Sequence, residues 1–524
     1  MKLFRAPLYL AAVLALTLSA ADTPDLTMVG RIRDEGFRNS KVMSIAQSLT
    51  DTLGARLTGS PNAKRANDWT RDKLAEFGLA NAHLEAFDFG RGWTSDACSV
   101  RMVAPDVEQL YALPKAWSPA TNGPTRGKVV HVKIETKEDA DKYKGKVAGA
   151  ILLVADAREM KPQEKPYLER YDEKTLATEG DYAIPPSRDP QRTKDLIRRL
   201  EKRKLIAQFA TDEKVAAIVD IGSGEGGVFR VQQGGTWRDD EPMGPPVVGL
   251  APEQYNRILR LVDAGTPVEL EVDVRARFFD DRNAYNTVAE IPGSDKKNNE
   301  VVMMGAHLDS WHTATGATDN AAGCAVIMEA ARILKALGVT PRRTIRVALW
   351  TGEEQGLFGS RAYAAEHFGR LSDPKDPDQL KLPAWARTER GRTLIESKPE
   401  LAKVSAYFNV DNGTGKIRGI YAQENAAAAP IFESWFAPLR DLGVTTVTMR
   451  NTGSTDHVSF DELGIPGFQF IQDDVEYETR THHTNWDTYE RLQRDDLMQA
   501  AVVVATTVWE AANRPEMMPR KPLH

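Results

Sequence analysis

From residue 286 onward, the chain alternates short apolar strands with amphipathic helices, and this alternation restricts the possible folds more than any other feature. Strands are predicted at 287–291, 301–304 and 343–350, and a helix at 321–337. This order is typical of an α/β protein with a doubly wound sheet, in which helices cover both faces. Such sheets bind ligands at the carboxyl ends of their strands, so polar residues that directly follow a strand are candidates for a functional site.

The first polar loop connects the strand at 301–304 to the helix at 321–337 and contains His307, Asp309 and Asp319. These side chains could be metal ligands with a supporting carboxylate. Equally, a buried histidine could bond one aspartate while Asp319 caps the helix. The loop alone leaves both interpretations open.

A second loop follows the strand at 343–350 and carries the adjacent carboxylates Glu353 and Glu354. Both cannot enter a dry core without a compensating cation, because burying an unpaired charge is costly. Adjacent residues project in different directions, so one could bind a metal while the other faces the reacting water. The alternative interpretation is a solvated helix start.

Two further loops carry polar residues after predicted strands. Asp411 follows an apolar strand at 406–410, although the sequence Asp-Asn-Gly is also an ordinary turn signature. His482 and His483 precede a C-terminal helix predicted from residue 492. Only 9 histidines occur in the whole chain, so this pair is informative, and a surface pair is the alternative.

Considered together, these loops provide two imidazoles and three carboxylates from four strand ends: His307, Asp319, Glu354, Asp411 and His483. Such a set suits two zinc ions, each with one histidine and one acidic ligand, while one carboxylate bridges them. Nitrogen and oxygen ligands without thiolate are typical of a catalytic site with open positions. One shared site explains the five residues better than five separate coincidences, so we predict two zinc ions.

The N-terminal segment has the pattern of a secretory signal peptide, predicted at 1–21. Lys2 and Arg5 precede an apolar run at 6–18, and small residues follow at 19–21. We therefore expect a mature chain from Asp22 that is secreted or periplasmic. No later stretch is apolar over the length that a membrane span requires, so no span is expected in the mature chain.

Length and composition add further limits. A chain of 524 residues exceeds the usual size of a single core, so several domains or a large insertion are expected. A hydrophobic content of 41%, a charged content of 27% and a net charge of −6 are ordinary for a globular protein and do not indicate a nucleic-acid partner. Cys98 and Cys324 are too few for a disulfide scaffold. Their pairing is left open, as is whether the protein forms a homodimer.

The middle of the chain differs from its two ends. At 113–277, short β-rich runs recur between glycines, prolines and charged residues. We predict a separate module there, inserted between two parts of a catalytic domain at 22–112 and 278–524. Within the module, the charge-dense stretch at 158–214 is predicted as a solvated insertion with a helix at 191–209.

The motifs resemble those of the zinc-dependent exopeptidases with a co-catalytic metal pair, of the secreted aminopeptidase and carboxypeptidase Q type. The resemblance covers nearly the whole mature chain. It is carried by Asp411 and by the segments 305–309, 318–323, 350–360, 454–457 and 483–488. It implies a doubly wound mixed sheet of the zinc exopeptidase type, and the β-rich module looks like that family's protease-associated domain insertion.

The resemblance also implies how the five candidate ligands divide between the two metals. Asp319 would bridge the zinc ions, His307 and Asp411 would complete one site, and Glu354 and His483 would complete the other.

Three more residues receive roles from the same resemblance. Glu353 would be the general base toward a metal-bridging water and would later protonate the leaving amine. Asp309 would orient the ring of His307. His482 stands where some relatives place a tyrosine that supports the tetrahedral intermediate, and a histidine could donate similarly.

The implied activity is hydrolysis of dipeptides or terminal peptide bonds, with a peptide or dipeptide as the substrate. We favour a dipeptidase or carboxypeptidase-like enzyme, because the signal peptide, the insertion and the segment 90–93 look closest to the carboxypeptidase Q type. An aminopeptidase that releases N-terminal residues is the alternative. Two less favoured classes are a glutaminyl cyclase, which works on one zinc ion, and a non-catalytic receptor-like protein that has lost metal ligands.

Overall fold

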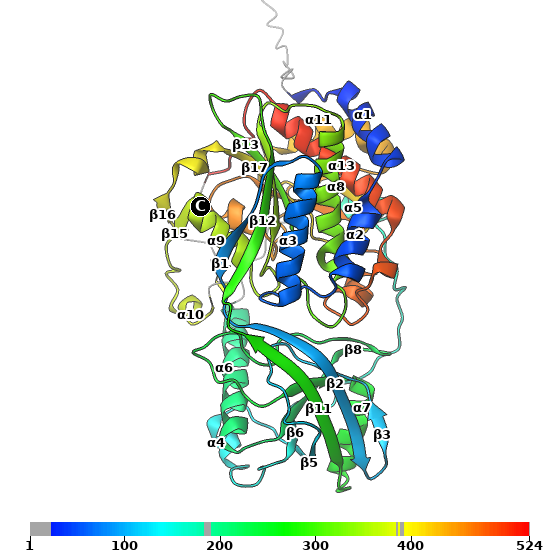
Figure 1. Cartoon of the computed structure of the whole chain (residues 1–524), viewed down its shortest axis with the longest axis vertical. Helices are drawn as coiled ribbons and strands as arrows, with labels where there is room; N and C mark the ends of the chain where they lie inside the picture. Colours follow the sequence, from blue (N-terminus) through cyan, green and yellow to red (C-terminus); the bar gives the residue numbers. More distant parts are fainter. Residues whose placement is uncertain (1–21, 183–189, 384–385, 388–391, 523–524) are drawn as a thin grey trace, which may run out of the picture.

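The computed structural model describes residues 22–182, 190–383, 386–387 and 392–522, and it contains two eight-stranded β-sheets. The two sheets with their helices form an upper and a lower part of an elongated molecule (Figure 1). The predicted α/β class is confirmed. The predicted signal peptide at 1–21 lies outside the described residues.

The first sheet is mixed, as predicted. Its central strands β14, β13, β17 and β20 run parallel, whereas β12 pairs antiparallel with both of its neighbours and β18 pairs antiparallel with β20. In sheet order the strands are β1 (Ala80–Asp88), β12 (Asn283–Ile291), β14 (Thr344–Trp350), β13 (Val301–His307), β17 (Val404–Asn409), β20 (Gly467–Gln472), β18 (Ile417–Tyr421) and β19 (Thr446–Thr448).

Helices cover both faces of this sheet because alternate side chains of each strand enter different cores. On β13, Val302 and Met304 belong to the core that contains α8 and α13, while Val301 and Met303 pack with residues of α9 and α12. Figure 1 shows α3, α8 and α13 on one side of the sheet and α9 on the other. The helices of this part are α1 (Leu26–Arg38), α2 (Val42–Gln47), α3 (Pro61–Glu76), α8 (Ala322–Ala336), α9 (Phe358–His367), α11 (Ala429–Phe436), α12 (Val458–Asp461) and α13 (Arg494–Asn513).

The second sheet is built mostly from the middle of the chain and has its own core. Val100, Val219 and Leu270 are fully buried between its strands and α7. In sheet order the strands are β3 (Glu108–Leu110), β2 (Gly92–Ala104), β11 (Glu269–Phe279), β5 (Thr125–His131), β6 (Ile151–Leu153), β7 (Ala217–Ile221), β10 (Val247–Leu250) and β4 (Ala112–Pro114); its helices are α4 (Lys137–Asp141), α6 (Pro190–Asp212) and α7 (Pro252–Asp263).

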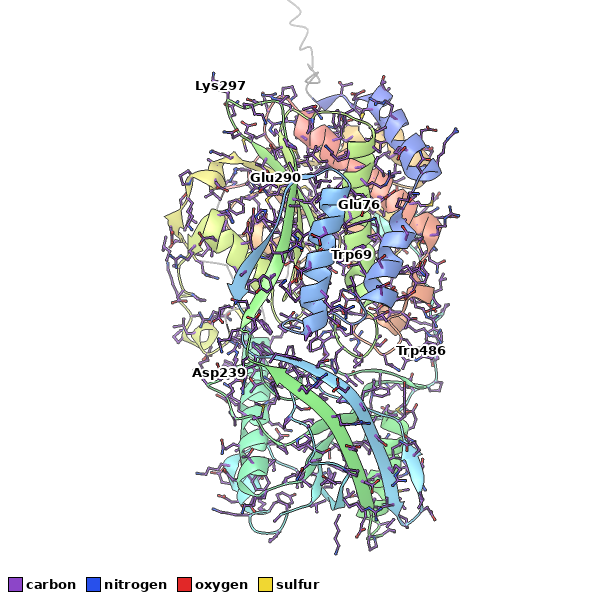
Figure 2. The ribbon with its side chains drawn as sticks, viewed as in Figure 1. Trp69, Glu76, Asp239, Glu290, Lys297 and Trp486 are labelled. Carbon is purple, nitrogen blue, oxygen red and sulfur yellow. The ribbon has the colours of Figure 1, made fainter. Side chains whose placement is uncertain are left out.

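Two neighbouring chain segments connect the sheets. Strand β1 leads into β2 and β11 leads into β12, and the paired strands continue as one antiparallel ribbon through the junction. There the backbone N–H of Phe89 donates to the carbonyl oxygen of Arg282 at 2.9 Å, and Asp239 pairs with Arg91 and Arg282. Figure 2 places Asp239 at the level of this junction.

The second sheet is larger than the module predicted at 113–277. It also contains β2 and β3, which lie in the stretch 22–112 assigned to the catalytic domain, and it ends with β11 at Phe279. The long strand β2 mixes buried, half-buried and exposed residues, so no change in composition marks its start. We propose 92–279 as the bounds of the inserted unit, with the catalytic domain on either side.

The charge-dense stretch at 158–214 contains the predicted helix as α6, and residues 161–170 before it are exposed, as expected for a solvated insertion. The end of this exposed segment also contacts the part of the chain that follows β20. The backbones of Glu169 and Val475 form a β-bridge. Arg170 pairs with the buried carboxylates of Asp473 at 3.2 Å and Asp496 at 2.7 Å. The carboxylates that pair with Arg170 come from a distant part of the chain. The composition of the segment itself therefore could not predict this contact.

We expect Arg170→Met to lower the free energy of unfolding by about 2 kcal/mol, because Asp496 and one side of Asp473 lose their cationic partner while they stay buried. The value lies below that of a fully buried pair, because Arg170 is partly exposed and Arg418 still contacts Asp473. Urea unfolding measures the change. The exposed Arg198→Met, which removes only a surface pair with Asp195, is the control. Equal losses of unfolding free energy in the two variants would show that the contacts of Arg170 with Asp473 and Asp496 do not stabilise the fold.

Candidate metal centre

The structure brings all five predicted ligands to one edge of the first sheet. His307 ends β13, Glu354 follows β14 and Asp411 follows β17. Asp319 lies in a tight turn at Ala317–Ala321 before α8, and His483 lies in the loop before α13. Since β13, β14 and β17 run parallel, their carboxyl ends meet at the same edge, which explains the convergence.

Asp319 lies between two histidines. Its Oδ1 atom is 3.1 Å from Nε2 of His307, and its Oδ2 atom is 3.1 Å from Nε2 of His483. Each imidazole nitrogen also faces a second carboxylate: His307 Nε2 is 3.2 Å from Asp411 Oδ1, and His483 Nε2 is 2.9 Å from Glu354 Oε2. The cluster therefore consists of two histidine–carboxylate pairs that share one aspartate.

These residues fit divalent cations. Oε1 of Glu354 is buried and has no hydrogen-bond partner among the described residues, so it is available as a ligand. Potential ligand atoms of His307, Glu353 and Asp411 lie within 4.8 Å of one another, and so do those of Asp319, His482 and His483. Imidazole nitrogens and carboxylate oxygens are the ligands that catalytic zinc sites use.

The electrostatics of the cluster follow from its burial. Burial, together with the neighbouring charge of Asp319, raises the pKa of Glu354 to about 7. Burial also raises the pKa of Glu353 well above its ordinary value, with Asp411 adding to the effect. Burial disfavours the charge on His307, but Asp411 and Glu353 outweigh it and hold the pKa of this histidine well above 6.5. A bound cation would offset this concentration of carboxylates.

Asp319 does not cap the helix, contrary to the alternative left open by the sequence. The N-cap of α8 is Ala321, and Asp319 has non-helical backbone angles. Ala321 has no side chain that can accept a hydrogen bond, so the residue before it, Asn320, supplies the capping interaction. Its Oδ1 accepts the backbone N–H of Gly323 in the first turn of α8 at 2.9 Å. A Cβ atom on Gly323 would lie 2.3 Å from that oxygen, so the close approach requires glycine. The carboxylate of Asp319 is thereby left for the two histidines.

Asp309 contacts more than the ring of His307. The Nδ1 atom of His307 is 3.0 Å from the backbone oxygen of Asp309 and 3.6 Å from its carboxylate. The carboxylate also accepts the backbone N–H groups of Glu353 at 3.2 Å and Glu354 at 3.3 Å, and the hydroxyl of Thr58 at 2.9 Å. Asp309 therefore connects the histidine of one loop with the paired glutamates of another.

His482 lies beside His483 and is only partly buried. Its ring stacks on Tyr477, with ring centroids 4.6 Å apart, and its Nδ1 is 3.5 Å from Glu478. Tyr477 was not singled out from the sequence, yet it is buried and lines the cleft beside the metal cluster. Only its position six residues before His483, in a loop with no regular pattern, could have pointed to it.

Two further residues hold the site, and the sequence analysis assigned no role to either. The carboxylate of Asp487 accepts the backbone N–H groups of Thr318 at 2.6 Å and Asp319 at 3.1 Å, which fixes the turn that carries the shared aspartate. The fully buried guanidinium of Arg56 donates to the carbonyl oxygens of Leu308, Thr315 and Gly316 between β13 and that turn. A lone arginine before α3 carries no sequence signal for such a role.

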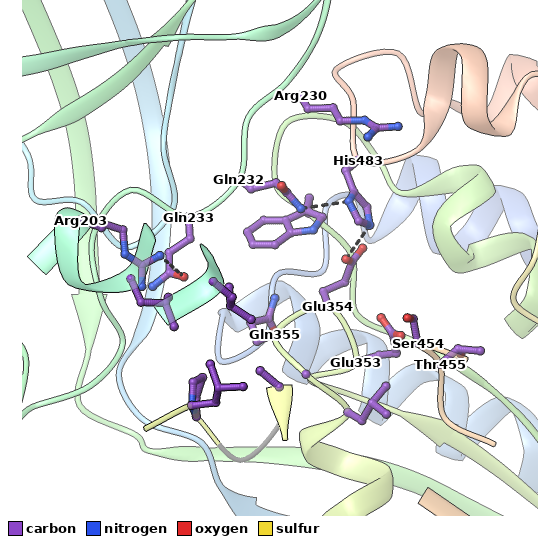
Figure 3. Close-up of a pocket in the computed structure, with 18 of the residues that line it drawn as sticks. Arg203, Arg230, Gln232, Gln233, Glu353, Glu354, Gln355, Ser454, Thr455 and His483 are labelled. Carbon is purple, nitrogen blue, oxygen red and sulfur yellow. Dashed lines mark hydrogen bonds and ion pairs between the residues drawn. The ribbon is translucent and has the colours of Figure 1, made fainter. Parts of the chain in front are cut away.

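A cleft of about 1430 Å³ opens beside the cluster, and both parts of the molecule line it. Glu353, Glu354 and His483 face it from the first sheet, while Gln232 and Arg203 face it from the second part (Figure 3). It is large enough for a short peptide.

Cys98 and Cys324 are both free, and Cys324 is fully buried in the first core. Within residues 22–182, 190–383 and 392–522, no helix is long and apolar enough to cross a membrane.

Comparison with known proteins identifies similar sequences along most of the chain. Residues 286–377 and 390–508 match the sequence model of Peptidase family M28. The chain is 26% identical to carboxypeptidase Q from Bos taurus, over 95% of this chain and 89% of that protein. It is 27% identical to aminopeptidase YwaD from Bacillus subtilis, over 52% of each chain.

Solved structures share the fold. A peptidase M28 precursor from Shewanella amazonensis SB2B superposes with a TM-score of 0.65 at 23% identity, covering 95% of this chain and 98% of that one. The zinc aminopeptidase BSAP from Bacillus subtilis superposes with a TM-score of 0.56 at 20% identity, covering 90% and 94%.

Proposed function

The chain belongs to peptidase family M28 and is a metallopeptidase, and from this premise we propose that it is a dizinc exopeptidase that hydrolyses dipeptides or terminal peptide bonds. The observation that carries the proposal is the shared Asp319, whose two oxygens face two different histidines. That arrangement supports His307 and Asp411 as ligands of one zinc ion and Glu354 and His483 as ligands of the other. When bound, zinc supplies Lewis acidity that polarises the scissile carbonyl and lowers the pKa of water.

Glu353 is the proposed general base. Its carboxylate takes a proton from the attacking water and delivers it to the leaving amine. The backbone of Glu353 is held by the carboxylate of Asp309, which also lies near the ring of His307. His482 is assigned to support the negative charge that develops on the substrate carbonyl, a role that Tyr477 assists by stacking on its ring.

The favoured substrate is a dipeptide or the C-terminal end of a peptide. The similarity to carboxypeptidase Q extends over 95% of the chain, whereas the similarity to aminopeptidase YwaD covers 52%. In addition, Arg203, Arg230 and Arg238 line the cleft and could receive a free carboxylate. The aminopeptidase alternative is supported by the same family and by the zinc aminopeptidase fold.

The signal peptide at 1–21 supports export to the periplasm or out of the cell. The second sheet is assigned to a protease-associated domain, and a homodimer is compatible with the sequence. A glutaminyl cyclase is the lesser alternative, and a stoichiometry of one tightly bound zinc ion per chain would favour it.

Direction of cleavage is tested with free dipeptides and with peptides blocked at either end. We expect free dipeptides to be cleaved and C-terminal amidation to abolish cleavage, because the amide has no charge for the arginines of the cleft. A chelator should remove the activity and added zinc should restore it. Product release is measured by chromatography. Cleavage that tolerates amidation but is lost on N-terminal acetylation would establish the aminopeptidase instead.

A further inference from the structure

The ring of His483 is held from the second part of the molecule. The side-chain amide nitrogen Nε2 of Gln232 lies 3.0 Å from Nδ1 of His483, on the opposite side of the ring from Asp319 and Glu354. Figure 3 shows this contact and the contact from His483 to Glu354 on either side of the ring. Gln232 follows the hairpin of β8 (Ser223–Glu225) and β9 (Val228–Arg230), which belongs to the inserted unit.

The same hairpin also fixes the backbone next to His483. The backbone N–H of Phe229 donates to Oδ1 of Asn485 at 2.9 Å, and Nδ2 of Asn485 donates to the carbonyl oxygen of Gly227 at 2.9 Å. Arg230 and Thr484 form an antiparallel β-bridge. Both the loop and the ring of His483 therefore take their position from the second part of the chain.

A metal-binding imidazole needs such a partner. When Nε2 coordinates a cation, Nδ1 carries the proton and requires an acceptor that sets the plane of the ring. A glutamine amide can turn its oxygen toward that N–H by rotating through 180°. His307 has its acceptor within its own segment, because its Nδ1 faces the backbone oxygen of Asp309. The two halves of the cluster are therefore supported differently.

We propose that Gln232 is a positioning residue for His483, so that the inserted unit forms part of the second metal site; this inference rests on the proposed role of His483 as a zinc ligand. Gln232 accepts the Nδ1–H of His483 and holds Nε2 toward Glu354 and Asp319. The first site, with His307 and Asp411, does not depend on it.

Zinc affinity tests the assignment without reference to peptide hydrolysis. Purified full-length protein is stripped of metal and titrated with zinc against a competing chelator. Gln232→Met, which is similar in size but has no acceptor of comparable strength, should weaken one of the two sites about 10- to 100-fold and leave the other unchanged. Gln232→Glu keeps an acceptor at the same distance and should retain near-normal affinity at both sites.

Gln233→Met is the matched control. Gln233 lines the same cleft, but its side chain contacts Arg203 and the backbone oxygen of Gly235 instead of His483. Its zinc affinities should equal those of the unmodified protein. Three results would each overturn the inference. The first is normal zinc affinity in Gln232→Met, and the second is an equal loss of affinity in Gln232→Met and Gln233→Met. The third is a loss in Gln232→Glu as large as that in Gln232→Met. A protein that binds two zinc ions but cleaves no peptide would refute the proposed function, and the affinities alone would still decide the role of Gln232.

Discussion

Glu353→Gln is expected to lower kcat/KM for peptide hydrolysis by a factor of about 10³ to 10⁴ while the protein still binds zinc. Glutamine has nearly the same shape as glutamate, but its amide cannot accept the proton of the attacking water. The backbone N–H of residue 353 can still donate to Asp309 at 3.2 Å, so the loop should keep its position. Steady-state kinetics with a dipeptide that the unmodified enzyme cleaves gives kcat/KM, and metal analysis of the same sample gives the zinc content.

The control for this substitution is Glu366→Gln. Glu366 lies on α9 with its side chain 79% exposed, and its replacement should leave kcat/KM unchanged. If Glu353→Gln retained activity within tenfold of the unmodified enzyme, Glu353 could not be the general base.

Asp319→Ala is expected to weaken both metal sites at once and to remove measurable activity. Each of its oxygens faces a different histidine, so no other single carboxylate of the cluster serves both pairs. We expect zinc affinity at both sites to fall by more than the roughly 100-fold that follows loss of an outer hydrogen-bond partner. Zinc content after dialysis and zinc titration against a chelator give the result.

Glu354→Ala and Asp411→Ala are the matched comparisons. Each removes a carboxylate that contacts only one of the two histidines, so each variant should keep one zinc site near its original affinity. An Asp319→Ala protein that kept one tight site would show that Asp319 is not shared between two ions.

The convergence of the candidate ligands was predictable from the sequence because it depends on strand direction. His307, Glu354 and Asp411 each follow an apolar run, and parallel neighbouring strands deliver such residues to the same edge. The elements themselves were also signalled locally: the helix predicted at 321–337 is α8, and the strand predicted at 343–350 is β14.

The supporting contacts could not be predicted, because they join segments that are far apart in the chain. Gln232 and His483 are 251 positions apart, and nothing in the pattern around Gln232 distinguishes it from an ordinary loop residue. The partners of Arg170 were hidden for the same reason, since a charged stretch favours solvent unless buried carboxylates lie opposite. The role of Asn320 as helix cap was obscured by Asp319, an equally good capping residue in the preceding position.

The paired ribbon that connects the two sheets has a consequence for the order of folding. Asp88 and Arg282 are in contact although 194 positions separate them. Closing an unstructured loop of that length, rather than one of a few residues, costs about 3 kcal/mol more in chain entropy. When the second sheet forms first, β2 and β11 hold the ends of the segment side by side, so β1 and β12 can pair as a local hairpin. In that order of folding, the sheet that carries the candidate metal ligands would gain its edge strand after the unit inserted between its halves has folded.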